Sequence, residues 1–138
     1  MIELVDGPID SVAALAQCTD DHCGAVSLFL GTTRRWTGSV ETAYLEYDAY
    51  RDMALAKMHE LADQAKLKWP IQKLAILHRL GRVDINEVSV LIAVSCPHRV
   101  DSITACHWLI DRLKEEVPIW KKEWYVAQAP QWIHPKAK

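Results

Sequence analysis

The chain has 138 residues, half of them hydrophobic, and its 16 Lys and Arg residues nearly balance 18 Asp and Glu residues, giving a formal net charge of -2. This length favours one globular domain, residues 1–138, with a sizeable core. A net charge this close to zero excludes a general attraction to nucleic acid, so a bound anion needs a local basic cluster. With no export signal and no apolar run of roughly 18 residues, we expect a soluble cytoplasmic protein that does not enter a membrane.

The four cysteines are scattered, without a CxxC pair, and are expected to remain thiols. Cys96 precedes a proline, a histidine and a predicted helix, all of which could stabilise a thiolate. We interpret it mainly as a small buried residue, because nothing in the sequence identifies a partner for it. Cys18, His22 and Cys23 are too sparse to indicate a zinc site.

The first half of the chain alternates between segments of helical and of strand character. Residues 9–16 offer an Asp or Ser cap followed by good helix formers, which predicts a short helix. Residues 24–30 and 44–50 read as strands, joined by a polar loop over 31–41. Apolar residues at helical spacing then predict a helix over 53–66.

In the second half, a long helix from Ser102 to about Glu116, with Asp101 as its cap, follows a group of strands. The predicted strands here are residues 73–77, 82–85 and 88–95, with short edge strands at 119–126 and 132–133. Because strands adjacent in sequence pair easily as hairpins, the order αββαββαβ favours an α+β fold. We expect a two-layer sandwich with a mainly antiparallel sheet and about three helices.

The segment Ser95-Cys-Pro-His-Arg99 takes the chain from an apolar strand directly into a long helix. Free backbone N–H groups and the helix dipole favour anions at such a place. Arg99 could add a bidentate grip on phosphate, and His98 could donate or accept a proton. A capped helix with a solvated arginine explains the same residues equally well.

Three lysines near the end of this helix and beyond it are candidates for chemistry. Lys114 lies at the margin of the apolar helix face, where it could snorkel or, if partly desolvated, act as a base. The alternation after Pro118 places Lys121 and Lys122 on opposite faces of a strand, so only one of them can easily serve a given pocket. A lysine pair on an edge strand can also simply prevent aggregation.

Two other basic segments have alternative interpretations. The loop Gly31-Thr-Thr-Arg34-Arg-Trp-Thr-Gly38 could close over an anionic planar ligand, or it could be an ordinary exposed loop. His78-Arg79, at the end of a predicted strand, could be a structural pair or could support a site formed by other residues.

Six motifs in register span about Gly24 to Trp132 and together resemble the large, catalytic subunit of molybdopterin synthase. These motifs are Gly31-Thr-Thr-Arg34, Leu45-Glu-Tyr-Asp-Ala-Tyr50, His78-Arg79-Leu-Gly81, Pro97-His98-Arg99, Asp111-Arg-Leu-Lys114 and Pro118-Ile-Trp-Lys-Lys-Glu123. The resemblance implies a hammerhead-like fold and a cytoplasmic sulfurtransferase of molybdenum-cofactor biosynthesis. It implies no metal and no cofactor.

In the family, a small ubiquitin-like subunit carries a C-terminal Gly-Gly thiocarboxylate and gives its sulfur to cyclic pyranopterin monophosphate, which becomes the dithiolene of molybdopterin. Its members typically form a homodimer of large subunits within a heterotetramer. By resemblance, Lys114 and Lys121 occupy the positions of the catalytic lysines. The anion-binding positions correspond to Arg34, His98 and Arg99, with His98 also a candidate proton carrier and Lys122 a weaker substrate contact.

Two features depart from the family pattern. Cys96 stands where another small residue is common, and the tail ends six residues after Trp132, which puts its reach over the pocket in doubt. The alternatives are a catalytically silent scaffold for a ubiquitin-like tail, a thiol enzyme that uses Cys96, and a nucleic-acid role for the interleaved basic and aromatic residues. The acidic balance of the chain argues against the last of these.

Overall fold

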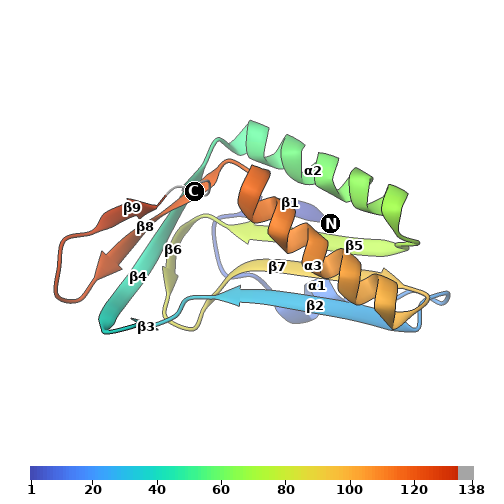
Figure 1. Ribbon diagram of the computed structural model, residues 1–138, viewed down its shortest axis with the longest axis horizontal. Helices are drawn as coiled ribbons and strands as arrows, with labels where there is room; N and C mark the ends of the chain where they lie inside the picture. Colours follow the sequence, from blue (N-terminus) through green and yellow to red (C-terminus); the bar gives the residue numbers. More distant parts are fainter. Residues whose placement is uncertain (134–138) are drawn as a thin grey trace.

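The computed structural model describes residues 1–133 and arranges their strands in two sheets (Figure 1). The first sheet has the order β1-β5-β7-β2. Its strands are β1 (Ile2–Val5), β5 (Lys73–Arg79), β7 (Val88–Cys96) and β2 (Ala25–Thr32). Central β7 is apolar and buried along almost its whole length, as expected for a strand covered on both faces.

The second sheet is built around β4 (Val40–Ala49), which pairs with β8 (Ile119–Tyr125) and β6 (Gly81–Asp84). Two shorter strands, β3 (Trp36–Thr37) and β9 (Gln131–Ile133), extend it. Only Leu80 separates β5 from β6, so the chain changes sheets in one sharp turn. Gly81 adopts φ +86, a left-handed conformation that glycine reaches without steric cost.

The helices cover both faces of the first sheet. Helices α2 (Arg51–Lys68) and α3 (Arg99–Glu116) lie on one face, and α1 (Ser11–Ala16) lies on the other (Figure 1). The larger core contains fully buried side chains from α2, α3 and the sheet, including Met58, Leu61, Ile76, Ile92 and Leu109. The smaller core holds Ala14 and Cys18 against the opposite face. Within residues 1–133, no helix is both long and apolar enough to cross a membrane.

The predicted α+β class, with three helices and mainly antiparallel pairing, is confirmed. Two aspects of the topology were not predicted. Strand β1 has only four residues, with a charged Glu3 among them, yet it pairs in parallel with β5. The strands also divide between two sheets, because β4 is long and pairs with β6 and β8 instead of joining β2.

The start of the long helix was predicted three residues too late. Helix α3 begins at Arg99, and His98 is its N-cap residue, with φ -126 and ψ 150 and no side-chain capping bond. Asp101 is therefore not the cap; it lies in the first turn, where its charge complements the helix dipole. In α1 the predicted Asp10 cap is confirmed, since its Oδ1 accepts a hydrogen bond of 3.0 Å from Ala13 N. The chain end after Ile133, the tail noted above, lies outside the described residues.

Candidate active site

A cavity of about 1000 Å³ opens where the second sheet meets the C-terminal end of α3. Its walls come from the end of β2 and the loop after it, one face of β4 and β8, the end of β5 and the last turn of α3. This volume suits a small-molecule ligand or the end of a peptide chain. Residues from segments far apart in the sequence therefore share one site.

Lys114 enters this cavity from the last turn of α3. It is exposed because it borders the open cavity, but the surrounding protein removes enough water to lower the pKa of its amine. The positive charge of Lys121 lowers that pKa further. Of the two interpretations from the sequence, partial desolvation fits this placement better than simple snorkelling.

Lys121 and Glu123 lie on the cavity face of β8 and form an ion pair of 3.1 Å between Nζ and Oε2. Glu123 also accepts a hydrogen bond of 2.7 Å from the Tyr125 hydroxyl. Burial alone would raise the pKa of Glu123, but the hydrogen bonds from Tyr125 and Lys121 outweigh it and lower the pKa. The carboxylate is therefore an anion at neutral pH and holds Lys121 in place.

Lys122 lies on the opposite face of β8. Its Nζ is 4.5 Å from the ring centre of Trp124 and 5.4 Å from that of Trp132, within the range of cation–π attraction. It does not line the cavity. The separation of the two neighbouring lysines that strand alternation predicts is therefore observed.

The loop after β2 contributes Thr33, Arg34 and Arg35 to the cavity. Arg35 pairs with Glu41 at 3.3 Å, whereas Arg34 lies close enough to Glu123 to lower the pKa of that carboxyl group. The Thr33 hydroxyl is buried and makes no hydrogen bond to any described residue. Arg34 and Thr33 thus offer donor groups to an anionic or polar ligand.

His98 and Arg99 lie at the other end of α3 and are exposed. Fifteen residues separate Arg99 from Lys114, and a rise of 1.5 Å per residue puts them about 22 Å apart along the helix axis. Neither residue lines the cavity. Within one chain, the structure brings together Arg34, Lys114 and Lys121 but not His98 and Arg99.

His78 and Tyr47 line the cavity beside these groups, although the sequence did not identify either as part of the site. His78 is only 5% exposed, and its ring makes an edge contact with Tyr47 at 4.9 Å between centres. Burial lowers the pKa of His78 to about 4, with Lys114 adding to the effect, so the imidazole is neutral at physiological pH. The strand register places Tyr47 directly opposite Lys121.

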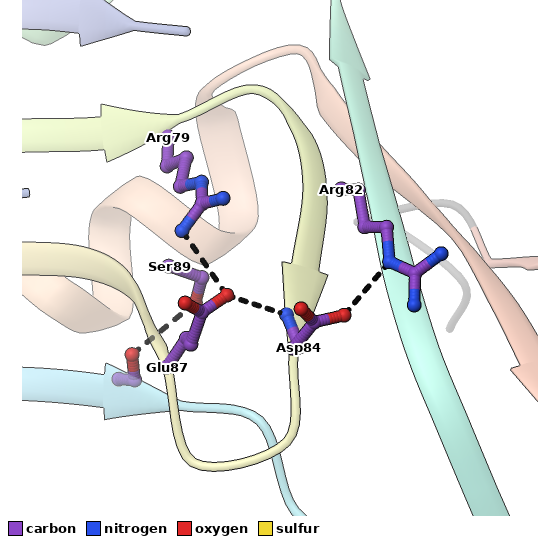
Figure 2. Close-up of polar contacts among 6 residues, drawn as sticks. Arg79, Arg82, Asp84, Glu87 and Ser89 are labelled. Atoms are coloured by element: carbon purple, nitrogen blue, oxygen red, sulfur yellow. Dashed lines mark hydrogen bonds and ion pairs between the residues drawn. The ribbon is translucent and has the colours of Figure 1, made fainter. Parts of the chain in front are cut away.

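The neighbour of His78, Arg79, belongs to a polar network that fixes the turn between β6 and β7 (Figure 2). Arg79 Nη1 lies 3.3 Å from Glu87 Oε1, which also accepts a 2.8 Å hydrogen bond from the Asp84 backbone N–H. Arg82 pairs with Asp84, and Ser89 donates to the Gly31 carbonyl on β2. His78 therefore lines the cavity, whereas its neighbour Arg79 has a structural role in the turn.

Cys96 is fully buried and lies at the end of β7, away from the cavity lining. Burial raises the pKa of its thiol to about 11, and Asp101 and Cys23 add to the effect, so the reactive thiolate is not populated at neutral pH. This argues against the thiol-enzyme interpretation. No cluster of three or more potential metal ligands occurs among the residues that the structure describes.

The cavity combines four cationic side chains, Arg34, Arg35, Lys114 and Lys121, with the carboxylate of Glu123. Lys114 and Lys121 come close enough to influence each other. Such a site attracts an anionic ligand and stabilises negative charge that develops during a reaction. A lysine with a lowered pKa also gives up its proton more readily than an ordinary lysine. Anion binding and acid–base catalysis can therefore occur in the same place.

Comparisons with known proteins agree on one family. The profile of the family described as "MoaE protein" matches residues 4–116. The molybdopterin synthase catalytic subunit of Halalkalibacterium halodurans is 43% identical over 120 residues, 87% of this chain and 77% of that protein. The crystal structure of molybdopterin synthase from Staphylococcus aureus superposes with a TM-score of 0.90 at 42% identity, covering 95% of each chain.

A more distant structure is a complex of subunits 1 and 2 of the molybdopterin-converting factor from Helicobacter pylori. One of its chains matches with a TM-score of 0.77 at 21% identity, covering 99% of this chain and 91% of that one. At this level of identity the likeness concerns the fold alone.

Proposed function

Because this chain belongs to the MoaE family of molybdopterin synthase catalytic subunits, enzymes of molybdenum-cofactor biosynthesis, we propose that it transfers sulfur to cyclic pyranopterin monophosphate. The sulfur donor is the thiocarboxylated C-terminus of a small ubiquitin-like subunit, and the product is the dithiolene of molybdopterin. We place this activity in one domain, residues 1–138, located in the cytoplasm.

The single observation that carries the proposal is the placement of Lys114 and Lys121 together in an open cavity. An ammonium group can hold the thiocarboxylate of the tail, and the lowered pKa of Lys114 allows its amine to take up a proton and return it. We assign both lysines to catalysis, as base or acid during sulfur addition and opening of the cyclic phosphate. Lys121 is oriented by Glu123.

The family's small subunit provides a tail that fits this site. A flexible Gly-Gly end is narrow enough to enter a cavity that begins at the surface, and its terminal charge is opposite to that of the lysines. A chain of the same fold from H. pylori was solved in a complex of two subunits, and we propose a second chain as partner here as well. Two large and two small subunits would form the heterotetramer.

For the pterin phosphate we propose Arg34 from the loop after β2, together with His98 and Arg99 from a second copy of the chain. The approximately 22 Å along α3 between Arg99 and Lys114 rules out a shared site within one chain. Lys122 faces away from the cavity, so we propose that its contribution to substrate binding is smaller than that of Lys121.

The free edge of β2 offers a way to bring the second copy into place. Among residues 1–133, β2 pairs only with β7, so its other edge is unpaired, and Val26, Leu28 and Leu30 on one face of the strand are each more than a third exposed. A long apolar edge strand readily pairs with another chain. A homodimer formed along this edge would bury these side chains.

The direction of α3 relative to β2 then determines which groups meet. Both run the same way across the sheet (Figure 1), because β2 is antiparallel to β7 and α3 returns after β7. If a twofold axis pairs two β2 strands antiparallel, the two α3 helices also lie antiparallel. The N-terminus of each, with His98 and Arg99, then approaches Lys114 of the other.

The proposed function is tested by reconstitution. Purified protein is mixed with thiocarboxylated small subunit and cyclic pyranopterin monophosphate, and the dithiolene product is measured by mass spectrometry beside a Lys114→Ala variant. We expect product from the wild type and a loss of ~100-fold or more in the variant, the size typical of a removed acid–base group. A wild type that binds the small subunit but gives no product would favour the scaffold alternative.

A further inference from the structure

His78 is a buried acceptor that the proposed lysine chemistry does not use. His78 lies near the end of β5, one residue before Arg79, and is 5% exposed. It lines the same cavity as Lys114. A buried imidazole at the wall of a cationic cavity needs a physical explanation, because burial of polar groups is costly unless they are hydrogen-bonded.

Two contacts hold the His78 ring, and a third anchors one of its partners. Its Nδ1 lies 2.9 Å from the backbone carbonyl oxygen of Arg79, so Nδ1 carries the proton and donates it to that oxygen. Tyr47 holds the ring from the side at 4.9 Å between centres and an interplanar angle of 68°. The carbonyl itself is anchored, because the Arg79 side chain is tied to Glu87 (Figure 2).

With Nδ1 committed to donation, Nε2 of a neutral ring can only accept. This nitrogen makes no hydrogen bond to any residue that the structure describes, and the ring is close enough to Lys114 to be affected by its charge. The other charged or titratable groups around Lys114 differ in chemistry from the neutral imidazole of His78. They are Lys121 and Glu123 on β8, Arg34 and Arg35 on the loop, Tyr47 on β4, and the His107–Asp111 pair on α3.

We propose that His78 is a positioning residue for Lys114: its Nε2 lone pair, which is unpaired among the described residues, accepts a hydrogen bond from the Lys114 amine when that long side chain turns toward it across the cavity, and holds the amine toward the ligand. A carboxylate in this place would fix Lys114 as an ammonium ion, since an opposite charge strongly favours the protonated form. A neutral acceptor orients the amine and still allows it to lose a proton. Glu123, the one carboxylate in the cavity lining, is instead paired with Lys121.

For its role in turnover this inference rests on the proposed function, but its first test does not. In the protein without substrate, lysines are acetylated with acetic anhydride over a pH series, and the extent at Lys114 is measured by peptide mass spectrometry. Exposed Lys66 on α2 is the internal reference. Because the pKa of His78 is about 4, its own titration does not interfere above pH 6.

Three variants separate positioning from packing. His78→Phe keeps a ring against Tyr47 but has no acceptor, and His78→Asn keeps an N–H for the Arg79 carbonyl but is too short to reach Lys114. His78→Gln can return an acceptor near the Nε2 position. His59→Gln, at an exposed site on α2, is the matched control. Circular dichroism and the thermal unfolding midpoint verify that each variant is folded.

We expect the midpoint of Lys114 labelling to fall by ~0.5–1 pH unit in His78→Phe and His78→Asn, because loss of an acceptor disfavours the ammonium form. His78→Gln should stay near the wild type, as should His59→Gln. In turnover, the first two variants should lose about tenfold or more in kcat with little change in KM for the small subunit. An unchanged Lys114 midpoint in folded His78→Phe and His78→Asn would overturn the inference, whether or not the protein proves to be a sulfurtransferase.

Discussion

Lys121 and Glu123 lie two residues apart on the same face of β8, and their side chains form an ion pair of 3.1 Å inside the cavity. The Glu123 side chain is 22% exposed and that of Lys121 33%, so solvent screens the pair only partly. The pair gives Lys121 a fixed position, whereas burial, with the charge of Lys121, lowers the pKa of Lys114. The two lysines are therefore not equivalent.

Replacing Glu123 with Gln should release Lys121 and lower both activity and stability. Because the folded pKa of Glu123 is below its ordinary value of 4.5, the charged carboxylate stabilises the fold above that pH, and this contribution is lost as the pH falls. We expect Glu123→Gln to be less stable by about 1 kcal/mol at neutral pH. Chemical denaturation at several pH values should show the difference closing below pH 4.5, and a gap independent of pH would contradict this explanation.

The two neighbouring lysines of β8 provide an internal comparison. Lys121→Ala should reduce sulfur transfer by ~100-fold or more, because it removes a cation from the reacting groups. Lys122→Ala should cost less than about tenfold, since this side chain packs on Trp124 and Trp132 outside the cavity. Initial rates of product formation compare the two. Equal losses would mean that the opposite faces of β8 do not determine their roles.

Mixing of two inactive variants tests whether each site is shared between two chains. Consider a heterodimer in which one chain carries Lys114→Ala and the other carries Arg99→Ala. If Arg99 acts in the partner's site, one of the two sites contains both substitutions and the other contains neither. After subunit exchange, the mixture should regain about a quarter of wild-type activity, because about half of the dimers are mixed and each has one intact site. If Arg99 acts within its own chain, no site is restored and the mixture stays inactive.

The edge of β2 can be tested independently of activity. Leu28→Lys places a charge on the exposed apolar strip without altering the buried core, since Leu28 is 40% exposed. We expect the variant to remain folded but to dissociate to monomers, because an unpaired charge opposes burial in an interface. Size-exclusion chromatography with light scattering measures the mass. A stable Leu28→Lys dimer would place the interface elsewhere.

Replacement of Cys96 distinguishes sulfur transfer at lysines from transfer by a protein thiol. Cys96→Ala should leave the transfer rate largely intact and cost about 1–2 kcal/mol of stability, because it removes a buried sulfur atom and leaves a small void. The thermal midpoint and the initial rate are the two readouts. Complete loss of activity in a folded variant would favour the thiol carrier.

The sequence predicted the main elements because their signals are local. Helical spacing marked both long helices, and the alternation after Pro118 separated Lys121 from Lys122, as observed. Strand β1 was missed because four residues including Glu3 give little periodicity, and its position depends on pairing with a strand about seventy residues away. The division into two sheets depends on the same kind of long-range pairing.

For the site, motifs identified the residues but not their distances. Lys114, Lys121 and Arg34 meet in one cavity, a long-range arrangement that local sequence signals do not give, whereas His98 and Arg99 lie at the far end of α3. His78 was noted only as part of a His-Arg pair. Its importance arises from burial and from the bond to the Arg79 carbonyl, and neither has a sequence signature.

Heavy-sulfur labelling follows the sulfur from the tail of the small subunit to the pterin at the Lys114 cavity. Small subunit carrying a ³⁴S thiocarboxylate is mixed with unlabelled enzyme and cyclic pyranopterin monophosphate, and product and protein are analysed by mass spectrometry. We predict that both dithiolene sulfurs are heavy, that no cysteine of the enzyme retains label, and that Lys114→Ala gives neither labelled product nor labelled protein. Light sulfur in the product, or label on Cys96, would contradict the account.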